Sequence, residues 1–429
     1  MKIYTNPPAA QWDELLKRPT MEVKELDGIV KGVLDDVRAH GDEAVAKYTK
    51  KFDKADLKTF QVSKAEVEAA EAALDEELKD AILLAKENIE SFHRQQRTSV
   101  SIVETMPGVK CWRRSVGIEK VGLYVPGGTA PLFSSVLMLG IPAVIGGCRE
   151  IVLCSPPNEK GELHPAIIYA ADQVGVSKIF KIGGIQAIAA MAYGTESVPQ
   201  VYKIFGPGNQ YVTAAKQMVS REGIAIDMPA GPSEVLVCAD ETADPTFVAA
   251  DLLSQAEHGV DSQVVLVAFD QDFVQRVQGA IEVQLASLPR QEIARKALDN
   301  SVAIVMEKTS EALDLINAYA PEHLILSVKD VESIAEAIIN AGSVFLGNFT
   351  PESAGDYASG TNHTLPTNGF ARAYSGVSVD SFVKKITFQQ ISESGLQKLG
   401  PAVEAMAAAE QLQAHKEAVS IRLARLSNA

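Results

Sequence analysis

Seven histidines are the side chains of this chain best suited to moving protons or holding a metal, and four of them lie in its second half. The four are His258, His323, His363 and His415. A lone histidine is more often structural, but imidazoles with nearby carboxylates supply both acid–base chemistry and metal ligands. The other three histidines are expected in exposed helices or after a polar turn, and we interpret them as structural.

The segment SQAEHG, residues 254–259, has the spacing of a metal-binding helix end. Gln255 and His258 are three residues apart and share a helix face, so both side chains can reach one point. Imidazole is an ordinary zinc ligand and a glutamine amide oxygen is a rare one, so spacing alone favours Glu257 over Gln255. Taken alone, a polar helix end stopped by Gly259 is the better explanation of this pattern.

The segment APEHLIL places Glu322 next to His323 at the start of an apolar run. Neighbouring carboxyl and imidazole groups, with ordinary pKa values of about 4.3 and 6.5, can transfer protons in sequence. Taken alone, a polar turn before a strand explains the pair at least as well.

Two glycine-rich turns, at 124–131 and 205–211, are candidates for nucleotide binding. The second follows an expected strand and opens an expected helix, as a phosphate-binding turn should. However, Tyr211 stands where the third glycine of the dinucleotide fingerprint belongs, and we find no acidic residue at the usual distance for a ribose. Dinucleotide binding here is therefore expected to be non-standard.

The four cysteines offer a different chemistry, in which a thiolate attacks an aldehyde. Cys154 and Cys238 lie in or at the ends of apolar strands, and Cys148 closes a Gly-Gly turn. None has an adjacent base in the sequence, so burial is favoured for all four.

The elements that must position these residues change character along the chain. Residues 22–98 carry apolar residues at helical spacing, and from residue 121 short β-branched runs alternate with amphipathic stretches. This alternation predicts two α/β series with mainly parallel sheets, joined near residues 227–234. The long polar segment 349–376 contains Asp356 and His363, which favours a functional loop. The remainder is expected to be a helical tail.

Composition excludes several classes of protein. With 55 acidic and 40 basic residues the net charge is −15, which makes a nucleic-acid partner unfavourable. Four cysteines in 429 residues are no disulfide framework. The uncharged run 121–148 contains three prolines and six glycines, so we interpret it as a buried strand–loop–helix unit rather than a membrane span. Without an apolar N-terminal leader, a cytoplasmic location is expected.

Seven long segments, in this order, resemble the histidinol dehydrogenase family over essentially the whole chain. They are GLYVPGGTAPLFSSVLML, GTESVPQVYKIFGPGN, AIDMPAGPSEVLV, DLLSQAEHG, PEHLIL, GSVFLGNFTPESAGDYASGTNHTLPT and AAAEQLQAHKEAVSIR. The resemblance implies NAD-dependent, zinc-containing oxidation of L-histidinol to L-histidine through bound L-histidinal, the last step of histidine biosynthesis. It also implies two incomplete Rossmann-like domains and a homodimer in which the C-terminal tail completes the neighbour's site.

The resemblance also implies roles for individual residues. The implied zinc ligands are Gln255, His258, Asp356 and His415, so the family pattern overrules the choice of Glu257. His323 is implied as general base and Glu322 as the group that activates water. The implied substrate-binding residues are the four zinc ligands and His323, together with Ser233, His363 and Glu410. The implied NAD contacts are Tyr124, Gln186 and Asn209.

The expected domain boundaries follow the same resemblance. They are an arm at 1–21, a metal-carrying and catalytic α/β domain at 22–121 with 233–377, a nucleotide-binding α/β domain at 122–232, and a dimerisation tail at 378–429. Two other readings stay open from the residues. One is a metal-free aldehyde dehydrogenase acting through Cys148 or Cys154, and the other is a non-enzymatic zinc-binding scaffold.

Overall fold

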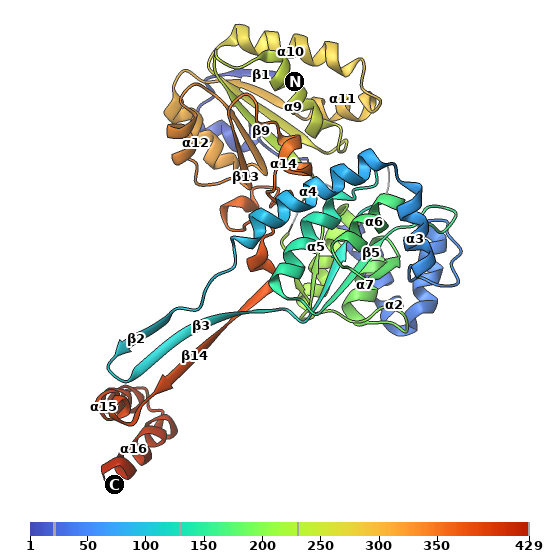
Figure 1. Ribbon diagram of the computed structural model, residues 1–429. Helices are drawn as coiled ribbons and strands as arrows, with labels where there is room; N and C mark the ends of the chain where they lie inside the picture. Colours follow the sequence, from blue (N-terminus) through green and yellow to red (C-terminus); the bar gives the residue numbers. More distant parts are fainter. Residues whose placement is uncertain (20–22, 128–129, 230, 428–429) are drawn as a thin grey trace. The chain divides into compact units, whose positions relative to one another are not determined.

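The computed structural model describes residues 1–19, 23–127, 130–229 and 231–427, and the chain forms two compact units (Figure 1). The first unit comprises Met1–Gln96 and Ile118–Phe382, and the second comprises Arg97–Gly117 with the chain from Val383 onward. Both parallel sheets belong to the first unit. The two α/β series predicted from the sequence are confirmed.

The first sheet has six parallel strands in the order β1-β11-β10-β9-β12-β13. The strands are β1 (Lys2–Thr5), β9 (Glu234–Ala239), β10 (Gln263–Ala268), β11 (Val302–Val305), β12 (His323–Ser327) and β13 (Ser343–Leu346). Its central strands are buried on both faces, which explains their almost uninterrupted apolar sequences. One face is covered by α9 (Pro245–Ala256), α10 (Gln271–Leu285) and α11 (Gln291–Asp299). The other is covered by α12 (Thr309–Tyr319), α13 (Val331–Glu336) and α1 (Trp12–Leu15).

The N-terminal arm is part of this sheet. Its first residues form β1, which pairs in parallel with β11 at the sheet edge, and Leu16 is buried on the face that α12 covers. The expected end of the arm, at residues 21–22, lies outside the described residues.

The second sheet has five parallel strands in the order β6-β5-β4-β7-β8. The strands are β4 (Lys120–Tyr124), β5 (Glu150–Ser155), β6 (Lys178–Lys181), β7 (Lys203–Phe205) and β8 (Ala225–Ile226), and the helices between them are α5 (Ser134–Gly146), α6 (Pro165–Gln173), α7 (Gly184–Tyr193) and α8 (Gln210–Arg221). Renumbered in chain order this is 3-2-1-4-5, which is the Rossmann order 3-2-1-4-5-6 without its sixth strand. The uncharged run 121–148 forms β4, a turn and α5, with residues 128 and 129 of the turn outside the described part.

The three N-terminal helices α2 (Val23–Phe52), α3 (Lys64–Ala73) and α4 (Glu76–Arg94) pack outside the helices of this second sheet, α3 and α4 on one face and α2 on the other (Figure 1). They pack on α7, α6 and α5 respectively. We expected residues 22–121 to belong to the domain of the six-stranded sheet, but these three helices pack on the helices of the five-stranded sheet. The physical reason is that α5 and α7 are apolar on nearly all sides and bury almost every residue, so they require a second helical layer.

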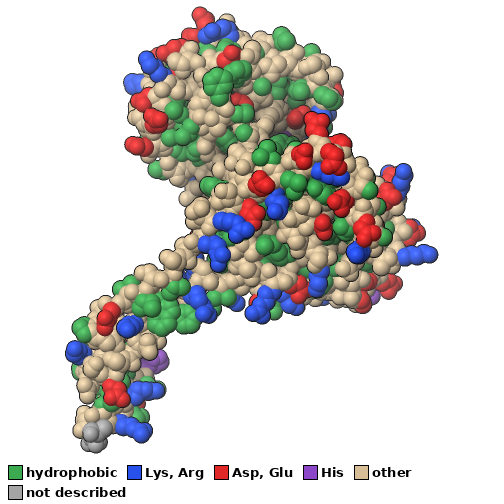
Figure 2. All heavy atoms as spheres, in the orientation of Figure 1, with side chains coloured by type: hydrophobic (Ala, Val, Ile, Leu, Met, Phe, Trp, Pro, Cys, Tyr) green, Lys and Arg blue, Asp and Glu red, His purple; other side chains and the backbone are tan. Residues whose placement is uncertain are grey.

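The second unit is a long antiparallel ribbon followed by two helices. The ribbon contains β2 (Ile102–Met106), β3 (Val109–Gly117) and β14 (Val383–Ile391), and the helices are α15 (Glu393–Ala409) and α16 (Gln413–Ser427). The expectation of a wholly helical tail is therefore wrong for residues 383–391, which pair along their whole length with β3. Apolar side chains are exposed on this unit, including those of Ile102, Met406 and Ile421 (Figure 2). Among the described helices of the chain, none is long and apolar enough to cross a membrane.

Candidate active site

The candidate catalytic pair lies where two neighbouring strands begin. His323 is the first residue of β12 and Glu322 immediately precedes it, while Glu234 begins β9, which pairs in parallel with β12. Helix α9 runs back antiparallel to β9, so its C-terminal end, with Gln255 and His258, returns to the same end of the sheet. The short helix α14 (Glu352–Tyr357) adds two carboxylates close to His323.

The imidazole of His323 is buried and surrounded by acceptors. Its Nδ1 donates to the backbone carbonyl of Glu234 at 3.3 Å, which leaves Nε2 of the neutral ring with its lone pair. Nδ1 is also 3.6 Å from Glu352 Oε1, and Nε2 is 3.5 Å from Asp356 Oδ1. Burial alone would lower the pKa of His323, but the carboxylates of Glu352, Glu322 and Asp356 outweigh it and raise that pKa well above its ordinary value. The carboxylates around the ring therefore stabilise a proton that is taken up at Nε2.

Glu322 is a buried carboxyl group with little access to water. Its Oε2 accepts the backbone N–H of Glu234 at 3.0 Å, and the side chain of Glu234 in turn accepts the backbone N–H of Glu322 at 3.3 Å. Burial raises the pKa of Glu322 to about 8, although the nearby His323 and the Glu234 N–H oppose this. Such a group can exchange a proton near neutral pH, as a water-activating base requires.

Several buried polar atoms of β12, α14 and α9 have no hydrogen-bond partner in the described part of the chain. They are Nε2 of His323, Oε2 of Glu352, Oδ1 of Asp356 and both amide atoms of Gln255. Leaving a buried polar group unpaired costs about 1–3 kcal/mol, so these atoms call for a shared partner. His323, Glu352 and Asp356 also place one possible ligand atom each within 4.8 Å of the others. Carboxylate, imidazole and amide donors of this kind fit a divalent cation.

The other expected metal and substrate residues have different surroundings. His258 is exposed, although nearby protein atoms desolvate its ring and lower its pKa, against the attraction of Asp356. The His363 Nδ1 donates to the backbone carbonyl of Asp356 at 2.8 Å, so its Nε2, at 3.1 Å from Ser135 Oγ, accepts the serine hydroxyl. Ser233 is half-buried beside Glu234.

Glu410 and His415 belong to the second unit, where they follow α15 and begin α16. Both side chains are exposed. The structure therefore brings together Glu322, His323 and Asp356 in the first unit, and His258 is close enough for its charge to interact with that of Asp356.

Sequence reasoning missed two carboxylates of this site, Glu234 and Glu352. Glu234 is 1% exposed and is a polar residue at the start of an otherwise apolar strand, which is a usable signal. Glu352, also 1% exposed, lies four residues before Asp356 and so on the same face of α14. That spacing was visible in PESAGDY.

The expected NAD-contacting residues lie around the carboxyl ends of the second sheet. Tyr124 ends β4, and its hydroxyl accepts the backbone N–H of Gly184 at 3.1 Å. Gln186, in the first turn of α7, donates to Asp53 at 3.2 Å, and its buried Oε1 has no partner among the described residues. Asn209 caps α8 by accepting the N–H groups of Tyr211 and Val212. In open α/β sheets this edge, beside the point where strand order reverses, is where nucleotides bind.

Three of the four cysteines, Cys148, Cys154 and Cys238, are poor nucleophiles in this structure. Burial raises the pKa of Cys148 to about 12, and burial with the charge of Asp240 does the same for Cys238. Burial also raises the pKa of Cys154, which is completely buried. A thiol with so high a pKa is almost entirely protonated near neutral pH, so thiolate attack on an aldehyde is disfavoured.

The chain combines a Rossmann-type parallel sheet with a buried cluster of carboxylates and an imidazole, some of whose possible metal-ligand atoms have no hydrogen-bond partner among the described residues. Together these features define an α/β protein of the dehydrogenase class. The chain belongs to the histidinol dehydrogenase family, whose model matches residues 16–423. It is 62% identical to the histidinol dehydrogenase of Bacteroides thetaiotaomicron over 423 residues, covering 99% of both chains. It is 51% identical to that of Escherichia coli K12 over 418 residues, covering 97% of this chain and 95% of that one.

A solved structure gives the same result for the fold. The crystal structure of histidinol dehydrogenase from Elizabethkingia anophelis matches with a TM-score of 0.98 at 56% identity, covering 100% of this chain and 99% of that chain. The family resemblance seen in the sequence is confirmed.

Proposed function

We propose that this chain oxidises L-histidinol to L-histidine through enzyme-bound L-histidinal, with NAD as oxidant and zinc as resident metal. The observation that carries the proposal is the buried pair Glu322–His323 beside unpaired metal-type ligands. One base can take the alcohol proton and a second can deliver water to the aldehyde, which is what two successive oxidations at one carbon require.

Bound zinc would hold the substrate's nitrogens and NAD would accept hydride, with Gln255, His258 and Asp356 as metal ligands from this chain. The protein's own work is then proton transfer. His323 takes the alcohol proton on Nε2, because Nδ1–H is engaged by the Glu234 carbonyl. Glu322 then takes a proton from the water that attacks the aldehyde. After His323 has released its first proton to solvent, it deprotonates the resulting diol.

The remaining proposed contacts are those with the substrate and with NAD. Ser233 and His363 would line the substrate pocket near Asp356. Tyr124, Gln186 and Asn209 would contact NAD at the carboxyl edge of the five-stranded sheet, with residues 122–232 as the nucleotide-binding domain and 233–377 carrying the metal and the catalytic pair. The cytoplasmic location stays a prediction.

We further propose a homodimer in which the tail of one subunit supplies His415 and Glu410 to the other's site. The second unit supports this because its ribbon and helices expose large apolar side chains, among them Ile102, Met406 and Ile421. His415 is exposed and available for a partner.

One assay tests the function most directly, namely the amount of NADH formed per L-histidinol supplied, with and without a chelator. We expect a ratio near two that collapses when the metal is removed and returns when zinc is added. A ratio of one would refute the two-step oxidation, and full activity after complete metal removal would refute the role of zinc.

A further inference from the structure

Arg18, in the N-terminal arm, makes a set of contacts at the base of the catalytic pair. Its Nε and Nη2 form a two-pronged ion pair with the carboxylate of Glu234, the second prong at 2.8 Å. The same Nη2 donates to the backbone carbonyl of Tyr319 at 2.8 Å, and the guanidinium lies 4.0 Å from the centre of the Tyr319 ring. A planar, permanently charged fork is suited to such simultaneous contacts, which an ammonium group cannot reproduce.

These contacts hold both ends of the turn that carries Glu322. Tyr319 ends α12, and Ala320 follows with φ +53°, a left-handed conformation that a non-glycine residue seldom adopts. At the other end of the turn, the Glu234 carboxylate that Arg18 holds accepts the backbone N–H of Glu322. Strained backbone persists only where its surroundings hold it in place, and here Arg18 provides part of that support.

Glu234 links the contacts of Arg18 to both proposed catalytic side chains. Its backbone N–H donates to the Glu322 carboxylate and its backbone carbonyl accepts from His323 Nδ1. The Glu234 side chain is 2% exposed, so without a cation it would be an uncompensated buried charge beside Glu322. Arg18 therefore both neutralises Glu234 and fixes the backbone that orients Glu322.

We propose that Arg18 is a positioning residue for the second oxidation, acting through Glu234 on the carboxylate of Glu322. The proposal rests on the proposed function and extends it to the N-terminal arm. Because Glu322 activates water only after the first hydride has left, misplacing its carboxylate affects the aldehyde step far more than the alcohol step. His323 depends on Glu234 only through a backbone carbonyl of β9, a strand that its pairing with β10 and β12 holds in place without Arg18.

The test compares NADH formation from L-histidinol and from L-histidinal, each supplied separately in a single turnover. Arg18→Gln should slow the aldehyde step about 10- to 100-fold, as expected for a misplaced reacting group, and change the alcohol step little. Arg18→Lys should fall between, because it keeps the charge and loses the fork. The matched control is Arg372→Gln, since Arg372 is exposed and donates to the neighbouring carbonyl of Ala318 without contacting Glu234. The control should leave both steps unchanged.

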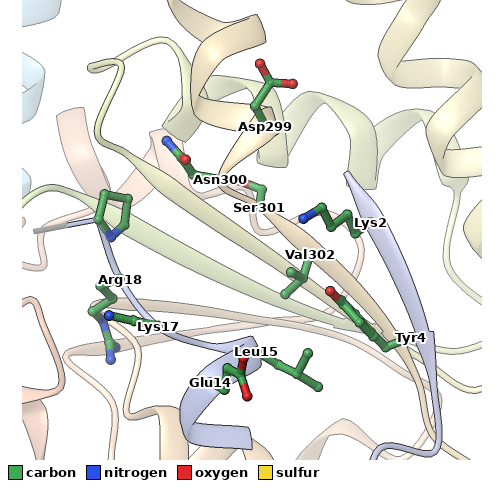
Figure 3. A pocket seen from close by; sticks show the side chains of 11 residues that line it. Lys2, Tyr4, Glu14, Leu15, Lys17, Arg18, Asp299, Asn300, Ser301 and Val302 are labelled. Atoms are coloured by element: carbon green, nitrogen blue, oxygen red, sulfur yellow. The ribbon is translucent and has the colours of Figure 1, made fainter. Parts of the chain in front are cut away.

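A surface cavity offers a rescue experiment. Arg18 lines a cavity of about 430 Å³ together with Lys2 and Tyr4 of β1 and Ser301 beside β11 (Figure 3). In Arg18→Ala, millimolar guanidinium can enter from this side and should restore the aldehyde step, whereas sodium chloride of equal ionic strength should not.

The outcomes separate this proposal from the function on which it rests. If the wild-type protein leaves L-histidinol unoxidised, the proposed function fails and the role of Arg18 falls with it. If the wild type works but Arg18→Gln slows both steps equally, the role of Arg18 alone is wrong. Should Arg18→Gln fail to fold, Arg18→Lys carries the same comparison.

Discussion

At the residue scale, the proposed chemistry depends on two proton acceptors that are held differently. His323 has Nδ1 fixed by a carbonyl and Nε2 without a partner in the described part of the chain, so the ring has one defined point of action. Glu322 is held through its backbone N–H and one carboxylate oxygen, both by Glu234. The two groups can thus act in turn on one carbon.

The division of labour predicts a selective defect in Glu322→Gln. The amide keeps the size of the side chain but cannot take a proton from water, so the aldehyde step should fall about 10²- to 10⁴-fold while the alcohol step is largely kept. The measurement is the NADH yield per L-histidinol within the first turnovers, which should approach one. Glu257→Gln, a half-buried carboxylate at the end of α9, is the control and should keep a yield near two. Equal loss of both steps in Glu322→Gln would contradict the assignment.

A second residue-scale prediction concerns Asp53, whose carboxylate accepts from Gln186. Burial raises the pKa of Asp53 to about 6, above the ordinary 3.8, so the folded protein binds this proton more tightly than the unfolded chain. Its contribution to stability is therefore full below about pH 4 and is lost as the pH rises through 6. Asp53→Asn should raise the thermal midpoint at pH 8 and change it little at pH 4. We expect about 1 kcal/mol at pH 8, allowing for partial exposure.

The control for this pH dependence is Asp56→Asn. Asp56 is exposed and pairs with Lys50 at 2.6 Å, which lowers the pKa of its carboxyl group. Its removal should therefore give no gain at pH 8. A thermal midpoint of Asp53→Asn that rises equally at both pH values would show that the charge of Asp53 is not the cause.

Sequence reasoning reached part of this site and missed the rest for a physical reason. Spacing could place Gln255 and His258 on one face, but it favoured Glu257, which the structure leaves half-buried at the helix end while Gln255 is fully buried. Glu234 and Glu322 are 88 residues apart and meet only because β9 and β12 are neighbours in the sheet. No local pattern carries such information.

At the element scale, the turn after β7 illustrates how the nucleotide edge is built. Gly206 has φ +126°, and a Cβ there would overlap the backbone carbonyl of Tyr124. The Gly206 N–H donates to Asp227 at 2.8 Å, and its carbonyl accepts from the buried Lys216 at 2.8 Å. The turn that leads to Asn209 is thereby fixed against β4.

We expect Gly206→Ala to weaken NAD binding and to destabilise the fold by about 2 kcal/mol or more, because the new methyl group strains the backbone and displaces the Tyr124 carbonyl. Calorimetric titration with NAD and thermal unfolding measure the two effects. Gly32→Ala is the control: Gly32 lies in α2 with open space around it, so alanine there should stabilise by up to about 1 kcal/mol. Unchanged NAD affinity in Gly206→Ala would contradict this account.

Most elements followed from periodicity, and the exceptions have identifiable causes. EIVLCS, for example, is β5 from Glu150 to Ser155, because a strand buried on both faces is written as an apolar run. Residues 383–391 mix lysine, glutamine and apolar residues in an exposed ribbon. Because neither face of the strand is buried, their sequence lacks the regular spacing of apolar residues that would predict a strand. The assignment of the N-terminal helices to a sheet could not be predicted, because periodicity reveals an apolar stripe and not its partner.

At the scale of the whole molecule, the proposed exchange of tails predicts complementation between inactive variants. His323→Ala and His415→Ala should each be inactive, but a mixed dimer would contain one site with both residues intact. Co-expression giving random pairing should therefore recover about a quarter of wild-type activity. A mixture that stays inactive although mixed dimers are isolated would show that both residues act within one chain.

The pairing of β1 with β11 has a consequence for synthesis on the ribosome. Lys2–Thr5 is made some 300 residues before its partner strand Val302–Val305. Arg18 likewise waits for Glu234 and Tyr319. Such distant pairing is slow and must follow the folding of more local parts, such as the five-stranded sheet. The nascent chain therefore carries Lys2–Thr5 and Arg18 without these partners until Val302–Val305 and Tyr319 have been made.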